Sequence, residues 1–178
     1  MSEFLEHMTR WMRYDAETDF YCRHFPSLAE HAEFSLRPLR KTDITRVVAV
    51  EQTAYQHPWE IGTFRDCFKI GYHGWIGEKG GQVVTYGILS VGAGECHLLN
   101  LCVATPYQGR GFGRYMLDRL IAEARKLRAE TVFLEVRDSN RRAIRLYQQA
   151  GFNEIGLRKG YYPAAQGRED AIVMALIL

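Results

Sequence analysis

Hydrophobic and polar residues alternate with a period of two in several segments of the chain, and this alternation predicts half-buried β-strands. The first such segment is Phe34-Ser35-Leu36-Arg37-Pro38-Leu39. Further on, glycine-bearing gaps at 79–81 and 92–94 separate apolar runs, which favours antiparallel hairpins. The predicted strands cover residues 34–39, 73–78, 82–91, 96–104, 131–137, 152–160 and 170–177.

Helical spacing characterises the segments between these strands. The clearest helix has an apolar stripe from Met116 to Leu127, with charged residues largely on the opposite side. An earlier helix begins after the N-cap candidates Thr42 and Asp43 and extends toward Tyr55. It ends before Pro58, because a proline disfavours the helical conformation in the residue that precedes it. Two shorter helices are predicted over 61–68 and 140–150.

The predicted order β-α-α-β-β-β-α-β-α-β-β indicates an α+β fold in which helices pack on a mixed sheet. Residues 34–178 form this domain, while residues 1–33 contain aromatic residues without a regular period. We interpret 1–33 as an N-terminal extension of uncertain order. A chain of 178 residues is long enough for one domain with a substantial core. Its oligomeric state is not predictable from these patterns.

Composition excludes several classes of protein. A net charge of +2 is too small to indicate direct nucleic-acid binding, and no apolar run approaches the length of a membrane span. The N-terminus has no apolar signal region, so we expect a cytoplasmic protein. Four scattered cysteines form no CxxC pair, and the six histidines match no ligand spacing. No metal site is therefore predicted.

A glycine-rich loop, Gln108-Gly109-Arg110-Gly111-Phe112-Gly113-Arg114, lies between a strand and the clearest helix. Glycines allow the backbone to approach a ligand, and a helix N-terminus attracts phosphate oxygens. Arg110 and Arg114 would add charge-assisted hydrogen bonds to an anion. The loop matches neither a P-loop nor a GxGxxG fingerprint. A glycine-rich helix entry without a ligand is the structural alternative.

Gln108-x-x-Gly111-x-Gly113, together with Leu134-Glu135-Val136-Arg137 and Gly151-Phe152, resembles motifs of the GNAT family of N-acetyltransferases. The resemblance covers roughly 34–178. Within the family, the segments His57-Pro58-Trp59, Asn100-Leu101-Cys102-Val103 and Tyr161-Tyr162-Pro163 resemble those of the RimI-like ribosomal-protein-alanine N-acetyltransferases. The family resemblance implies a three-layer fold whose mostly antiparallel mixed sheet splays between the fourth and fifth strands, with helices on both faces. It also implies that acetyl-CoA enters the gap as co-substrate.

The resemblance further implies which residues hold acetyl-CoA. The backbone of Leu101, Cys102 and Val103 would pair with the pantetheine arm, and Asn140 would contact the co-substrate. The loop residues Gly109, Arg110, Gly111, Phe112, Gly113 and Arg114 would cradle the pyrophosphate. Many relatives carry a basic residue at the position of Gly109. Two consequences of this departure stay open: a looser loop, or a larger share of the positive charge on Arg110 and Arg114.

Two residues are candidates for the chemistry. Glu135 lies within an otherwise strand-like segment, where a glutamate is unusual; a solvated Glu135–Arg137 pair is the structural alternative. Tyr147 follows Asn140 by seven residues, nearly two helical turns, so the two share a face. A tyrosine that only packs in the core is the alternative for Tyr147. The resemblance implies that Glu135 accepts the proton of the amine and that Tyr147 donates a proton to the leaving thiolate.

The same resemblance implies that the acceptor is the N-terminal alanine of the eighteenth small-subunit ribosomal protein. The loop 161–170 would lie beside the entrance for the amine, where Glu169 and Asp170 are candidates to meet a basic peptide; ordinary hairpin residues are the alternative. Two other functions stay open. One is acetylation of a small-molecule amine, and the other is a module that binds acetyl-CoA without turnover.

Overall fold

The computed structural model describes residues 34–178, and the predicted extension over 1–33 lies outside them. Seven strands form one sheet in the order β1-β2-β3-β4-β5-β7-β6. The strands are β1 (Phe34–Pro38), β2 (His73–Lys79), β3 (Gln82–Gly92), β4 (Glu95–Val103), β5 (Thr131–Arg137), β6 (Asn153–Pro163) and β7 (Arg168–Ile177). The α-helices are α3 (Ile44–Ala54), α4 (Ile61–Ile70), α5 (Phe112–Lys126) and α6 (Arg141–Gln149). Each predicted strand and helix between 34 and 178 is thus confirmed, with boundaries shifted by a few residues.

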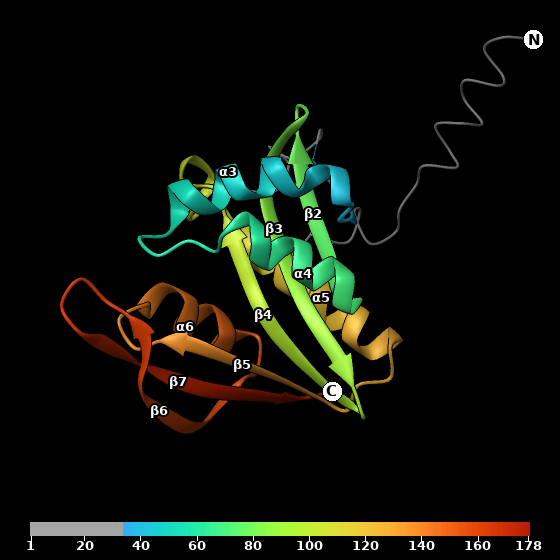
Figure 1. The fold of residues 1–178 in the computed structure, drawn as a ribbon. Helices are drawn as coiled ribbons and strands as arrows, with labels where there is room; N and C mark the ends of the chain where they lie inside the picture. Colours follow the sequence, from blue (N-terminus) through green and yellow to red (C-terminus); the bar gives the residue numbers. More distant parts are fainter. Residues whose placement is uncertain (1–33) are drawn as a thin grey trace, which may run out of the picture. The chain divides into compact units, whose positions relative to one another are not determined.

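The predicted hairpins and the splay of the sheet are also confirmed. β2–β3 and β3–β4 pair antiparallel, and the intervening turns hold Gly80, Gly81 and Gly94 at positive φ. β4 and β5 pair in parallel only from Glu95–Thr131 to Leu98–Leu134. Beyond these pairs the two strands diverge, as Figure 1 shows. A gap therefore opens between β4 and β5 at their carboxyl ends.

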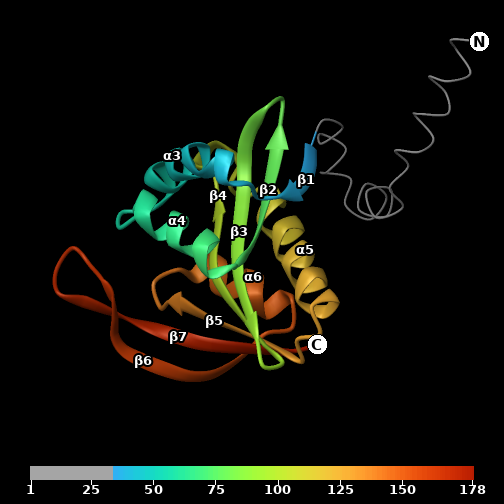
Figure 2. The same ribbon diagram turned by 45° about the vertical axis from the view of Figure 1, so that its right-hand side comes forward.

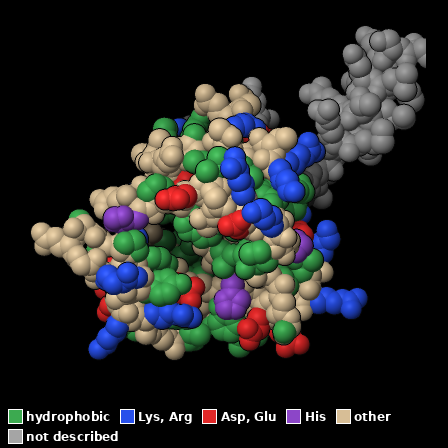
Figure 3. All heavy atoms as spheres, viewed as in Figure 1, with side chains coloured by type: hydrophobic (Ala, Val, Ile, Leu, Met, Phe, Trp, Pro, Cys, Tyr) green, Lys and Arg blue, Asp and Glu red, His purple; other side chains and the backbone are tan. Residues whose placement is uncertain are grey.

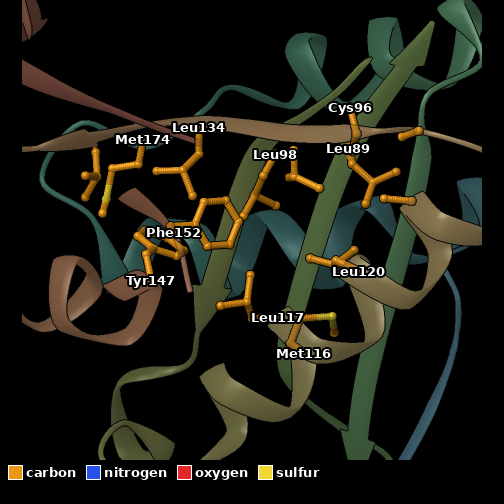
Figure 4. Packing of buried hydrophobic residues seen from close by; sticks show 14 of the residues in the cluster. Leu89, Cys96, Leu98, Met116, Leu117, Leu120, Leu134, Tyr147, Phe152 and Met174 are labelled. Carbon is orange, nitrogen blue, oxygen red and sulfur yellow. The ribbon is translucent and has the colours of Figure 1, made fainter. Parts of the chain in front are cut away.

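Helices cover both faces of the sheet, which matches the expected three layers (Figure 2). One hydrophobic cluster lies between the sheet and α5 and α6; it includes Met116, Leu117, Leu134, Tyr147 and Phe152 (Figure 4). A second cluster lies between the sheet and α3 and α4. Within residues 34–178, no helix is both long and apolar enough to cross a bilayer.

A β-bulge in β4 changes which side chains face each layer. Ile88 pairs with Asn100 but Leu89 pairs with Leu98, so Leu99 is an extra residue in β4. Such a one-residue shift exchanges the two faces of a strand. Cys96 and Leu98 accordingly belong to the α5–α6 cluster, whereas Cys102 belongs to the α3–α4 cluster. The bulge lies where the sheet opens, so it determines which side chains border the gap.

Candidate active site

Two adjacent cavities occupy the gap between β4 and β5. The larger cleft has a volume of about 550 Å³, and the smaller cleft about 290 Å³. The lining of the larger cleft comprises Ala54, Tyr55, Leu101, Cys102, Val103, Gln108, Gly109, Gly111, Gly113, Arg114, Asn140, Arg142, Ala143, Arg145, Leu146 and Gln149. Tyr55, Leu101, Asn140, Ala143 and Leu146 also line the smaller cleft, so the two cavities are neighbours.

The backbone of the glycine-rich loop forms one wall of the larger cleft. Gly109 and Gly111 have φ values of 80° and 88°, a conformation that other residues rarely adopt. Gly111 is the N-cap of α5, so the unpaired first amides of that helix lie at this wall. A Cβ on Gly109 would meet open space. The glycines at 109 and 111 are therefore required chiefly by backbone conformation.

The two predicted arginines have different surroundings. Arg114 lines the larger cleft, and its Nε lies 2.8 Å from Asp118 Oδ1. Arg110 is exposed, with its guanidinium 5.9 Å from the ring centre of Tyr107, and it is absent from the lining. Phe112 is also absent from the lining, because its side chain is buried against Phe34. Only the backbone of Phe112 is left for a ligand.

Two basic residues that sequence reasoning missed line the larger cleft from α6. Arg142 and Arg145 are exposed and three residues apart, so they share a helix face. Arg142 Nη1 donates to Gln108 Oε1 at 3.2 Å, and Gln108 Nε2 donates to the Val103 carbonyl at 3.0 Å. This chain of contacts connects α6 to the end of β4. The helical spacing of arginines after Asn140 was the signal that could have revealed them.

Asn140 borders both clefts as the N-cap of α6. Its Oδ1 accepts a hydrogen bond from the Ala143 backbone N–H at 3.2 Å. N-cap residues satisfy amides that a helix cannot pair internally. Asn140 therefore orients the helix that carries Ala143, Leu146 and Tyr147 into the gap.

The smaller cleft collects side chains from distant parts of the chain. It is lined by Glu51, Tyr55, His57, Trp59, Leu98, Leu99, Asn100, Leu101, Glu135, Val136, Arg137, Asn140, Ala143, Leu146, Tyr147, Tyr162 and Pro163. The face drawn in Figure 3 is hollowed between the α3–α4 side and the β5–β7 side, with hydrophobic side chains around the hollow. Glu135 and Tyr147 are thus brought into one cavity.

Glu135 is half-buried and forms an ion pair with Arg158, whose Nη2 lies 3.0 Å from Glu135 Oε1. The Tyr162 hydroxyl donates to the Glu135 backbone carbonyl at 2.9 Å. Arg137 instead pairs with Glu169, with 3.0 Å between Nη1 and Oε2. The structural alternative of a Glu135–Arg137 pair is therefore not formed, and the β6–β7 hairpin holds Glu135 in position.

Tyr147 is buried in the α5–α6 cluster, with its ring centre 5.7 Å from that of Phe152 (Figure 4). It also lines the smaller cleft, so it both packs in the core and borders the cavity. Burial, and to a smaller extent the neighbouring Tyr162, raises the pKa of Tyr147 well above its ordinary value. A tyrosine hydroxyl already carries its proton at neutral pH, and the raised pKa extends that range, so the hydroxyl is available as a donor.

The predicted entrance loop contributes Tyr162 and Pro163 to the smaller cleft. Its two acids are engaged within the protein. Glu169 accepts a hydrogen bond from the Ser139 backbone N–H at 2.8 Å, and Asp170 accepts one from the Gly160 N–H at 2.7 Å. Burial is the largest single influence on Glu169 and acts to raise its pKa. Hydrogen bonds from Ser139 and Arg137, together with the charge of Arg137, outweigh burial, so the pKa of Glu169 is lowered. These carboxylates organise the hairpin, so the aromatic residue and the proline form the wall.

Sequence reasoning missed two residues of the smaller cleft. Glu51 lies on α3, and Tyr55 is the C-cap of that helix. Glu51 is a buried carboxylate, and the Tyr55 hydroxyl donates to the Leu101 carbonyl at 2.8 Å. Their spacing of four places them on one helical face, but this pattern also describes an ordinary core position. Within residues 34–178, no group of three His, Cys, Asp or Glu side chains is arranged to hold a metal ion.

The lining of the larger cleft has features that favour phosphate oxygens and an extended amide chain. Positive-φ glycines, a helix N-terminus and basic side chains favour phosphate oxygens. Leu101 and Val103 lie beyond the parallel β4–β5 pairs, where β4 has separated from β5. An extended amide chain therefore has a strand edge along which to bind.

Comparison with known proteins agrees with this geometry. The model of the acetyltransferase (GNAT) family matches residues 44–152. A [ribosomal protein bS18]-alanine N-acetyltransferase of Escherichia coli K12 is 39% identical over 142 residues, which cover 80% of this chain and 96% of the relative. The crystal structure of the E. coli ribosomal-protein-S18-alanine N-acetyltransferase has a TM-score of 0.77 and 39% identity, and the match covers 81% of this chain and 93% of that one.

A more distant structure, yncA from Salmonella typhimurium with its cofactor acetyl-CoA, shares the fold at 20% identity and a TM-score of 0.69. The match covers 82% of this chain and 94% of the yncA chain.

Proposed function

Because the chain belongs to the acetyltransferase (GNAT) family, we propose that it transfers the acetyl group of acetyl-CoA to the N-terminal amine of a protein. The acceptor we propose is the N-terminal alanine of ribosomal protein bS18, in the cytoplasm. The observation that carries this proposal is the identity of 39% over 96% of a relative that is named for this reaction. The adjacent clefts support it, since one suits the co-substrate and the other an acceptor.

Acetyl-CoA would occupy the larger cleft and supply an acyl group activated as a thioester. The backbone of Leu101 to Val103 would hold the pantetheine arm. The amides of Gly109 to Arg114 would hold the pyrophosphate, with Arg114 contributing a charged side chain at the wall. Asn140 would hold the co-substrate where the two clefts meet.

Glu135 would act as the general base. An α-amino group has a pKa of about 7.7–8.0, so most of it carries a proton at neutral pH. The Glu135 carboxylate lines the smaller cleft and is oriented by Arg158, so it can accept the proton that the amine loses. The deprotonated nitrogen then forms the new amide bond.

Tyr147 would act as the general acid. When the bond between the acyl carbon and the sulfur breaks, the sulfur leaves as a thiolate, and a proton donated to it stabilises this leaving group. The Tyr147 hydroxyl is protonated at neutral pH, as a tyrosine with the ordinary pKa of about 10 is, and burial raises its pKa further. It borders the smaller cleft beside residues that line both cavities, and this position suits donation to the leaving sulfur.

The acceptor would enter through the smaller cleft. Aromatic side chains from two elements, Trp59 and Tyr162, form walls for the first residues of a peptide. The direct test measures thiol release from acetyl-CoA with a synthetic peptide that begins with the alanine of the organism's own bS18. We expect turnover with this peptide and none with the same peptide blocked at its α-amine.

Free amines provide the decisive comparison. Turnover of a polyamine or another small amine, without turnover of the peptide, would favour the small-molecule alternative. Absence of thiol release with every acceptor would favour the binding module. In cells, mass spectrometry of bS18 from a strain that lacks this gene should show an unmodified N-terminus, and an acetylated N-terminus would contradict the proposed acceptor.

A further inference from the structure

We propose that Glu51 is a positioning residue that shapes the wall of the acceptor cavity, an inference that rests on the proposed function. Glu51 belongs to α3 and lines the smaller cleft, yet its side chain is only 1% exposed. Burying a carboxylate is costly unless hydrogen bonds compensate. A buried carboxylate at the edge of a substrate cavity therefore calls for identifiable partners.

Three donors from three different segments converge on Glu51. The Trp59 backbone N–H donates to Oε1 at 2.9 Å, and Asn100 Nδ2 approaches the same oxygen at 3.4 Å. The Tyr86 hydroxyl of β3 donates to Oε2 in a short hydrogen bond. Glu51 thus connects α3 with the segment that precedes α4, with the centre of the sheet and with β4.

The hydrogen-bond partners of Glu51 either line the smaller cleft or pack behind residues that line it. Trp59 and Asn100 line the smaller cleft themselves. The Trp59 ring centre lies 5.5 Å from that of Phe64, and the Phe64 ring centre lies 5.8 Å from that of Tyr86, so a row of edge-to-face aromatic contacts runs beside the polar network. Asn100 follows the bulge residue Leu99, and the bulge turns the Asn100 side chain toward α3.

The network holds the acceptor side of the gap and not the co-substrate side. Glu51, Trp59 and Asn100 line the smaller cleft but are absent from the lining of the larger one. The segment 55–60 lies between two helices and contains the exposed residues 56–58. A hydrogen bond from its Trp59 amide to a buried carboxylate is a strong constraint on such a segment.

The test compares Glu51→Ala and Glu51→Gln with wild type in steady-state kinetics with the bS18 peptide. We expect Glu51→Ala to raise the KM for the peptide about tenfold, because Trp59 and Asn100 lose the carboxylate that holds them in the cavity wall. The KM for acetyl-CoA should change less than about twofold, because Glu51 does not line the larger cleft. Glu51→Gln should stay within about threefold of wild type for the peptide, since its amide oxygen still accepts from Trp59 and Asn100.

Glu123 provides the matched control. It is another buried glutamate, on α5, and it lines neither cleft. Glu123→Ala should leave both KM values near those of wild type. Hydrogen exchange adds a readout that needs no acceptor: the amides of residues 55–60 should exchange faster in Glu51→Ala and not in Glu123→Ala.

Three results would overturn the proposal: an unchanged peptide KM in folded Glu51→Ala, an equal rise of both KM values, or a Gln variant as impaired as the Ala variant. If Glu51→Ala does not fold, Glu51→Asp replaces it, because the shorter chain withdraws the carboxylate from Trp59. Its peptide KM must then rise at least about threefold. Wild-type protein without peptide turnover would refute the proposed function, whereas normal exchange at 55–60 in the variant would refute the network.

Discussion

The two clefts differ in how the chain builds them. The larger cleft takes most of its lining from two stretches, 101–114 and 140–149. The smaller cleft gathers residues from α3, the segment before α4, β4, β5, α6 and the β6–β7 hairpin. Backbone amides and glycine conformation dominate the first, and side chains held by remote partners dominate the second. The proposed co-substrate site is therefore built mainly from two stretches of sequence, whereas the proposed site of acceptor binding and proton transfer depends on the assembled fold.

The largest expected effect tests the chemistry in the smaller cleft. Glu135→Gln removes the proposed base and should lower kcat roughly 10²–10⁴-fold near neutral pH. Activity should recover partly at higher pH, because more of the acceptor amine is then already deprotonated. The KM for acetyl-CoA should stay near that of wild type. Turnover indistinguishable from wild type would remove Glu135 from this role.

Tyr147→Phe should have the next largest effect. The variant keeps the ring that packs on Phe152 but lacks the hydroxyl, so kcat should fall roughly 10²-fold with both KM values nearly unchanged. Tyr107→Phe is the control, because Tyr107 lines neither cleft. Weaker acetyl-CoA binding with normal turnover would contradict the acid role. It would assign Tyr147 to co-substrate binding, so that the two clefts would no longer have separate roles.

Gly111→Ala tests the larger cleft. A Cβ at φ 88° is strained, so the loop should shift and the KM for acetyl-CoA should rise about tenfold, with the peptide KM nearly unchanged. Gly62→Ala, in α4 where an added Cβ would meet open space, should change neither value. Equal increases in both KM values for Gly111→Ala would show that the two clefts are not independent.

The smallest effect is expected for Arg142→Ala. This exposed arginine lines the larger cleft, so its loss should raise the KM for acetyl-CoA about threefold at low salt and less at high salt. Arg125→Ala, an exposed arginine in the last turn of α5, should have no effect. A change in peptide KM alone would assign Arg142 to the acceptor side.

Much of the fold follows from local patterns. The periods of the strands and helices, the hairpin glycines and the glycine-rich loop were all readable because each depends on residues a few positions apart. The bulge at Leu99 was not, since no residue around it signals the shift and only the pairing with β3 reveals the extra residue. Asn100 therefore faces α3, a position that uninterrupted alternation with Cys96 and Leu98 does not predict.

The order of elements, the location of the glycine-rich loop proposed to bind phosphate and the two candidates for proton transfer were all predictable from the residues alone. The folded chain was needed to show that Glu135 pairs with Arg158, that Arg142 and Arg145 border the larger cleft, and that Glu51 is buried among three donors. The reason is physical. Backbone conformation responds to near neighbours, whereas the burial and pairing of a charged side chain depend on segments that meet only after folding.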